Sequence, residues 1–238
     1  MNSHARILNG ARMRAKAAAV VLAMLWLRPA AAAESLEAVL ARMDQAAPTF
    51  KGLAAQLRKV SHTAVINEDT VDKGTMLLKR ARNDMRMLVE FAEPDPKSIA
   101  VHGERVEIYY PKIQTVEEYD MGKNRALLDQ FLLIGFGTSG RELSAAYQMK
   151  YLGEESIGGT NTAHLELIPK SKEVLQQLSK LELWIHETGA YPVQQKITQR
   201  GGDYHLFTYS DVKLNTPHAD AELKLKAPKN AKHVTPQK

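Results

Sequence analysis

The sequence predicts a mainly β fold (α+β), an open antiparallel β-barrel or half-barrel of about eleven strands covered by a helical lid. Three observations predict it. Short apolar runs with a period of two residues recur along the chain, and turn-forming residues separate them. One strongly apolar segment near the middle has the period of a helix. Residues 34–238 are numerous enough for one domain with a hydrophobic core.

The N-terminal 33 residues have the three parts of a secretory signal peptide. Four Arg and Lys residues precede an apolar run at 17–27, and a small-residue end, Ala31-Ala32-Ala33, follows it. The apolar run has eleven residues, fewer than the about 20 that a membrane-spanning helix needs. We therefore expect residues 1–33 to be cleaved before Glu34 and the rest to be exported to the periplasm.

Removal of this segment changes the charge of the protein. The whole chain has 32 Lys and Arg against 27 Asp and Glu, and five of the basic residues but none of the acidic ones lie in 1–33. The mature chain thus has 27 of each and is formally neutral. Nucleic-acid binding depends on a basic surface, so we do not expect that class of function.

The chain contains no cysteine. Disulfides therefore cannot stabilise the exported protein, and the cysteine to which a bacterial lipoprotein attaches its lipid is missing. We expect a soluble monomer with a single domain at 34–227, followed by a basic, disordered tail at 228–238.

The mature chain opens with a predicted helix, because Leu36, Val39, Leu40 and Met43 fall on one helical face before Pro48 ends it. Alternating runs then predict strands, which we expect to pair as antiparallel hairpins. They lie at 74–80, 87–91, 106–110, 147–151, 165–167, 181–185, 193–197 and 204–214.

Two segments interrupt the strands. Residues 124–134 have the apolar pattern of a helix that is more hydrophobic than a surface helix, so it must cover an apolar surface. Its lid-forming side chains are Leu127, Leu128, Phe131 and Leu132. Residues 171–178 predict a second short helix, with Ser171 as its cap.

A barrel of this size either packs its interior with side chains or encloses a ligand. Strand alternation selects eight apolar residues for the inner face. They are Met76, Leu78, Met87, Val89, Phe91, Val106, Ile108 and Tyr110. Because they are apolar and include the adaptable side chain of methionine, they are the candidate lining of a cavity.

The sequence contains little that is typical of catalytic or cofactor-binding motifs. Residues 135–140 (GFGTSG) match a dinucleotide-binding pattern, but a helix rather than a strand precedes them, so a hinge is the better interpretation. Histidines lack metal-ligand spacing, and His164, His186 and His205 are expected on solvated strand faces. We expect no metal, no cofactor and no enzymatic activity.

Three motifs resemble the periplasmic carriers of outer-membrane lipoproteins, the LolA family. They are a glycine-opened strand ending in Lys-Arg at 74–80 (GTMLLKR), a strand ending before proline at 90–94 (EFAEP) and a hairpin at 102–111 (HGERVEIYYP). The order of the helices and strands extends the resemblance over most of 34–227.

The resemblance implies a LolA-like open barrel whose apolar cavity shields the acyl chains of a lipoprotein between the inner and outer membranes. It implies an inner-membrane release machinery and an outer-membrane acceptor as partners. It also implies that Arg80 is a lid latch, which bonds to backbone carbonyls near residues 124–134.

The chain departs from the family at three places. Ala81 stands where the family usually has proline, the next turn is about three residues longer, and Met87, Val89 and Glu107 replace expected aromatic residues. These departures keep a second hypothesis open, a carrier or sensor for another lipid or lipid-linked product. An enzyme or a structural envelope protein on the same barrel is the third.

Overall fold

The computed structural model describes residues 34–81, 84–122 and 134–236. Its twelve described strands form one open sheet in the order β12-β6-β5-β4-β3-β2-β1-β11-β10-β9-β8-β7. Every neighbouring pair is antiparallel except β12 and β6. The mainly β, open antiparallel architecture predicted from the sequence is therefore confirmed.

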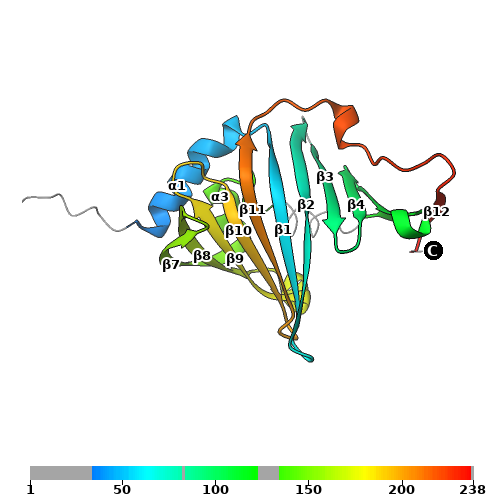
Figure 1. The fold of residues 1–238 in the computed structure, drawn as a ribbon. Coiled ribbons are helices and arrows are strands. Elements are labelled where there is room, and N and C mark those ends of the chain that lie inside the picture. Colours follow the sequence, from blue (N-terminus) through cyan, green and yellow to red (C-terminus); the bar gives the residue numbers. More distant parts are fainter. Residues whose placement is uncertain (1–33, 82–83, 123–133, 237–238) are drawn as a thin grey trace, which may run out of the picture. The chain divides into compact units, whose positions relative to one another are not determined.

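The strands are long near the middle of the sheet and short toward the β12 edge. Their bounds are β1 Gly52–Thr63, β2 Glu68–Ala81, β3 Asp84–Glu93, β4 Lys97–His102, β5 Arg105–Tyr110, β6 Thr115–Asp120, β7 Tyr147–Ile157, β8 Thr160–Pro169, β9 Leu178–His186, β10 Pro192–Gln199, β11 Tyr204–Leu214 and β12 Lys232–Val234. Figure 1 shows β1 beside β11 in the middle of the sheet, so strands from both ends of the domain meet there.

Local sequence signals account for the helices. α1 (Leu36–Ala46) begins where the Ser35 hydroxyl accepts a hydrogen bond from Ala38 N, and it passes into the short helix η1 (Ala47–Thr49). α4 (Lys172–Gln177) has the predicted Ser171 cap. α3 (Gly140–Ala146) was not predicted, although its capping box of Ser139 and Glu142 is a readable signal. Short helices also occur at Pro111–Ile113 (η2) and Asp220–Leu223 (η4).

Two apolar clusters fill the face of the sheet that carries Met76 and Val89, which we call the inner face. Over β7–β10, α1 and α3 pack Val39, Met43 and Leu143 against the strands. Over β1–β4, Phe50 and Phe136 join the cluster. Among the described residues, α1 and α3 thus cover only the β7–β10 half of this face.

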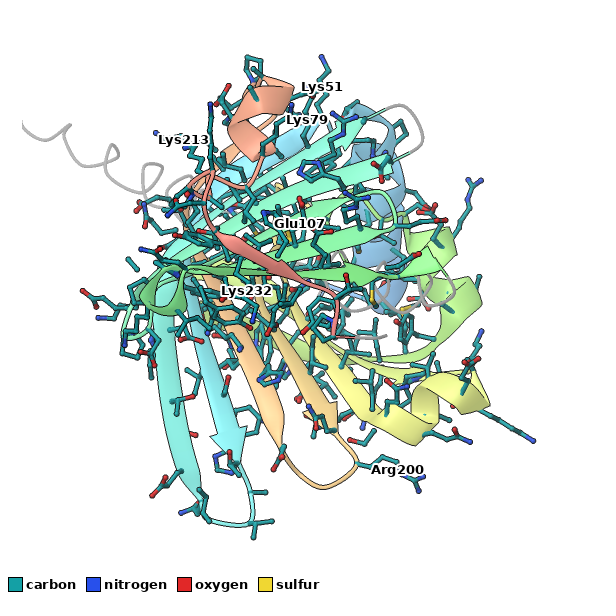
Figure 2. All side chains as sticks on the ribbon, turned by 90° about the vertical axis from the view of Figure 1, so that its right-hand side faces the viewer. Lys51, Lys79, Glu107, Arg200, Lys213 and Lys232 are labelled. Carbon is teal, nitrogen blue, oxygen red and sulfur yellow. The ribbon has the colours of Figure 1, made fainter. Side chains whose placement is uncertain are left out.

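The C-terminal segment differs from the sequence prediction. Residues 228–238 were expected to be disordered, but β12 (Lys232–Val234) adds to the edge strand β6 in parallel. Ala231 is buried with Tyr109 and Val116, and Leu225 and Ala227 pack against them. Small apolar residues within a basic stretch thus hold the segment on the outer face, where Figure 2 shows it crossing the strand of Glu107.

Membrane-spanning helices are absent from the part of the chain that the structure describes. No helix there has both the length and the apolar character to cross a bilayer.

Candidate functional site

The inner face of β1–β5, β10 and β11 lines a partly open cavity of about 340 Å³. This volume falls in the range of about 300–1,000 Å³ typical of small-molecule sites. Most of its lining is apolar. The lining residues are Leu57, Lys59, Met76, Met87, Val89, Phe91, Lys97, Ile99, Val106, Ile108, Gln195, His205, Phe207 and Tyr209.

Strand register explains why these side chains meet. Ile108 pairs with Ile99, Ile99 with Val89, and Val89 with Met76. Paired residues in neighbouring strands point to the same face, so this register makes one apolar row across four strands. The row forms the middle of the cavity.

Six of the eight residues predicted for the inner face line this cavity: Met76, Met87, Val89, Phe91, Val106 and Ile108. Leu78 is fully buried in the apolar cluster beside it. Tyr110 is half-buried near Glu117, and burial together with that carboxylate raises the pKa of the phenol. Lipid binding by this set remains a prediction.

Sequence reasoning missed the contribution of the second half of the chain. Gln195 of β10 and His205, Phe207 and Tyr209 of β11 line the same cavity. His205 was expected on a solvated face, but burial, followed by the nearby charge of Lys59, lowers the pKa of its imidazole. The sequence alone could predict that residues 205, 207 and 209 share one face of a strand, but it could not predict that β11 pairs with β1.

Aromatic side chains pack beside the cavity at Tyr209, and Arg80 lies farther along β2. Phe136 is buried and meets the Tyr209 ring edge-on, at 5.0 Å between centroids. The Arg80 guanidinium donates to the carbonyls of Ala47, at 3.0 Å, and Gly137, at 2.5 Å. We call these two bonds the Arg80 anchor, because they join β2 to the end of α1 and to the segment before α3.

The role of Arg80 as a lid latch remains a prediction. Backbone carbonyls near residues 124–134 were expected, and the two described carbonyls belong to residues 47 and 137. The predicted lid residues Leu127, Leu128, Phe131 and Leu132 lie outside the described residues.

The glycines of the 135–140 motif serve packing within the chain. A Cβ on Gly137 would lie 2.4 Å from the Phe50 ring, and one on Gly140 would lie 2.5 Å from the Leu40 carbonyl of α1. These close approaches explain why glycine stands at both positions.

A buried amide fixes the same segment from the other side. Gln195 is 1% exposed, accepts a hydrogen bond from the Tyr209 hydroxyl at 2.6 Å and donates to the Ile134 carbonyl. Burial raises the pKa of Tyr209, so the hydroxyl stays protonated and serves as the donor. Gln195 thus ties β10 and β11 to the start of the segment that Arg80 holds at Gly137.

Replacing Gln195 with Leu is expected to destabilise the protein by about 2–4 kcal/mol, because it leaves the Tyr209 hydroxyl and the Ile134 carbonyl buried without partners. For a domain of this size the midpoint of thermal unfolding should fall by about 5–15 °C. Adding Tyr209→Phe to Gln195→Leu removes one orphaned group and should recover about 1 kcal/mol. A double variant that is less stable than the single one would contradict this account.

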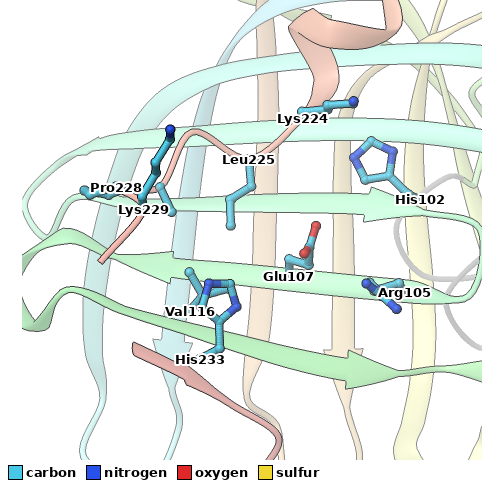
Figure 3. A pocket seen from close by; sticks show the side chains of 10 residues that line it. His102, Arg105, Glu107, Val116, Lys224, Leu225, Pro228, Lys229 and His233 are labelled. Carbon is cyan, nitrogen blue, oxygen red and sulfur yellow. The ribbon is translucent and has the colours of Figure 1, made fainter. Parts of the chain in front are cut away.

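A second pocket, of about 560 Å³, lies on the outer face beneath the C-terminal segment. Figure 3 shows that His102, Arg105 and Glu107 on β4 and β5 line this pocket together with Lys224 and Lys229 of that segment. Glu107 alternates with the inner residues Val106 and Ile108, which places it on the outer face. The charged lining makes this pocket unsuitable for an acyl chain.

Comparisons with solved structures support the fold. A MucB structure matches with a TM-score of 0.52 and 13% identity over 81% of this chain and 63% of that chain. An uncharacterized conserved protein from Thermus thermophilus matches with a TM-score of 0.52 and 13% identity over 85% of this chain and 99% of that chain. At this identity, both similarities show the fold alone.

A LolA superfamily protein from Nitrosomonas europaea also matches, with 14% identity, a TM-score of 0.39, and coverage of 81% of this chain and 99% of that chain. The chain spans less than two thirds of the length of the MucB structures that it matches. No protein-family model and no curated protein matches the sequence. The open antiparallel sheet preceded by an N-terminal helix, which the sequence predicts, is confirmed by the structure and agrees with the two matches that have a TM-score of 0.52.

Proposed function

We propose that this LolA-like chain is an exported periplasmic carrier that holds the acyl part of a lipid cargo in the inner-face cavity. The observation that carries the proposal is the apolar row of Ile108, Ile99, Val89 and Met76 along a cavity of about 340 Å³. An exported protein meets acyl chains in membranes, and an apolar lining on one face of an open sheet is suited to remove them from water.

The affinity expected of such a cavity suits a carrier. Each buried CH₂ contributes about 0.8 kcal/mol, so about ten of them contribute roughly 8 kcal/mol before the entropic costs of binding. Without those costs this value would correspond to a dissociation constant of about 1 μM, so the net affinity is weaker than that and permits release to an acceptor. Transfer between apolar sites breaks no covalent bond, and we therefore propose binding and transport without catalysis.

The first proposed cargo is an acylated lipoprotein on its way from the inner to the outer membrane. The motifs at 74–80, 90–94 and 102–111 support it by their resemblance to LolA, and with it a donor in the inner membrane and an acceptor in the outer one. A second cargo, another lipid or a lipid-linked product, is favoured by the volume of the cavity. About 340 Å³ among the described residues is small for an anchor with several acyl chains.

Mass spectrometry of molecules that co-purify with the protein tests the proposal. The mature protein would be isolated gently from the periplasm and extracted with organic solvent. Acylated lipoproteins in the bound fraction would support the first cargo, and a free lipid would support the second. If purified protein carries no lipid and takes up none from vesicles, the proposed function is wrong.

Replacing Arg80 with Leu is expected to leave the fold intact but to slow cargo transfer several-fold, because the Arg80 anchor joins three segments next to the apolar cluster beside the cavity. Arg80 is exposed, so its loss should cost at most about 1–2 kcal/mol of stability. Transfer of a fluorescent lipid between donor and acceptor vesicles measures the effect. Arg58→Leu, an exposed arginine of β1 on the outer face, is the control and should transfer lipid like the parent.

A further inference from the structure

The end of the cavity away from Arg80 carries charge. Lys59 of β1 and Lys97 of β4 line the cavity there, and Asp72 of β2 lies between them. Asp72 and Arg80 are eight residues apart on one strand, which corresponds to about 26 Å. The cavity therefore has an apolar middle and a charged end, the arrangement expected for a molecule with a tail and a head.

The three charged side chains are close together and shielded. The Asp72 carboxylate lies 3.3 Å from the Lys97 ammonium and 3.7 Å from that of Lys59. Their side chains are 11%, 23% and 20% exposed, respectively. Partial burial strengthens electrostatic interactions with a ligand, since fewer water molecules screen the charges.

Two lysines share this one carboxylate, which leaves one formal positive charge. Asp95 pairs with Lys112, which lowers the pKa of its carboxyl most, and the charge of Lys97 makes a smaller contribution. Asp203 accepts a hydrogen bond from the backbone N–H of Ala64. Neutralising Asp72 requires only one lysine, so the second ammonium is available for an anion.

The electrostatic interactions within the cluster also favour the binding of an anion. Burial lowers the pKa of Lys59 most, Asp72 raises it, and the charge of Lys97 lowers it again. The charge of Lys97 thus disfavours the charged form of Lys59, and a second anion between the two ammonium groups would relieve that repulsion. Lys97 also lies over the Phe91 ring, 5.1 Å from its centroid, which places its ammonium beside the apolar lining.

We propose that the cavity selects amphiphiles with an anionic head group, a carboxylate or a phosphate, which pairs with Lys59 and Lys97 while the tail lies along the apolar row. This inference rests on the proposed binding of acyl chains and adds the chemistry of the head. Head-group pairing at one end would also fix the direction in which the tail enters.

Dodecanoate and dodecanol at pH 8 test it, because they share a tail and differ in charge. Each would displace a solvatochromic dye from the delipidated full-length mature protein. The parent should bind dodecanoate about tenfold more tightly than dodecanol. Equal affinities would overturn the inference and leave the proposed function standing, whereas failure of both to bind would defeat the inference and the proposed function together.

Two variants with opposite expected effects test whether the charged cluster causes the preference for dodecanoate over dodecanol. Lys97→Met keeps the apolar stem and the Lys59–Asp72 pair, and it should weaken dodecanoate binding about tenfold without changing dodecanol binding. Asp72→Asn removes the competing anion and should strengthen dodecanoate binding, with thermal unfolding as the check on folding. If both variants bind dodecanoate like the parent, the cluster is not the head-group site.

Inorganic phosphate separates an amphiphile site from a site for free anions. Phosphate alone should not displace the dye at millimolar concentration, since it gains nothing from the apolar row. Displacement by phosphate with an affinity equal to that of dodecanoate would overturn the proposal that the ligand is an amphiphile.

Discussion

Ile99→Asp is expected to lower the affinity of the protein for an acyl chain at least about 100-fold. Ile99 lies at the middle of the apolar row, with Val89 on one side and Ile108 on the other, and all three line the cavity. A carboxylate there would have to lose its hydration when a tail enters, and burying an unpaired charge costs several kcal/mol. Dye displacement by dodecanoate or dodecanol measures the loss.

Folding of this variant is expected because Ile99 is only partly buried. In the free protein the new carboxylate therefore keeps contact with water. Ile99→Asn is the matched control, since it has the same shape and no charge, and it should lose far less affinity than Ile99→Asp. Lowering the pH should restore part of the binding to Ile99→Asp as its carboxyl takes up a proton.

Unchanged binding by Ile99→Asp would place the acyl chain outside this cavity. It would contradict the choice of the inner face, because the pleat sends every other residue of β4 to the opposite side of the sheet. The variant therefore tests the face of the sheet and the proposed function at once.

Local alternation explains why much of the cavity was predictable. Met76 follows the exposed Thr75, and Val89 precedes the polar Glu90, although the buried Leu88 separates Met87 from Val89. The pleat of a strand sends such alternate positions to opposite faces of the sheet. In each strand, choosing the set of alternate positions with the more apolar side chains was enough to find six lining residues. No knowledge of strand pairing was needed for them.

Contacts between residues of different strands explain what was not predictable. Lys59, Asp72 and Lys97 lie on three strands, and each reads as a solvated charge in its own segment. They meet only because β1 pairs with β2 and β4 folds back on β3. Likewise, β12 pairs with a strand more than 100 residues earlier, so no local signal could distinguish it from a disordered tail.

The Arg80 anchor was predictable from the sequence only in part. Its arginine was selected by resemblance, while its carbonyl partners were set by how closely two backbones approach. Gly137 permits that approach, because any Cβ there would lie 2.4 Å from Phe50 Cδ1 and 2.6 Å from Arg80 Nη2. Gly137 in the motif at 135–140 thus indicates a close approach of two backbones, whereas the match to a dinucleotide-binding pattern does not.

Gly137→Ala is accordingly expected to destabilise the protein by about 2–4 kcal/mol. Gly137 has a φ of +64°, which costs an alanine about 1–2 kcal/mol. The remainder comes from displacing the buried Phe50 ring, since overpacking a filled site costs about 1–3 kcal/mol. Urea denaturation measures the change in the free energy of unfolding.

Gly158→Ala separates the two contributions. Gly158 has a φ of +58°, and a Cβ built there meets no atom within 4 Å, so this variant pays the backbone cost alone. It should lose about 1 kcal/mol, and Gly137→Ala should lose at least twice as much. Equal losses would mean that Phe50 and Arg80 move aside freely and that the segment before α3 is not held where the structure places it.

Combining Gly137→Ala with Arg80→Leu then tests whether both act on one anchor. If the alanine already displaces Gly137 from Arg80, removing the guanidinium should add less in the double variant than it does alone, a coupling of about 1 kcal/mol. Independent sites would instead give additive losses. Because a shared anchor predicts the same non-additivity in lipid transfer between vesicles, the double variant connects the packing of one glycine to the release of cargo.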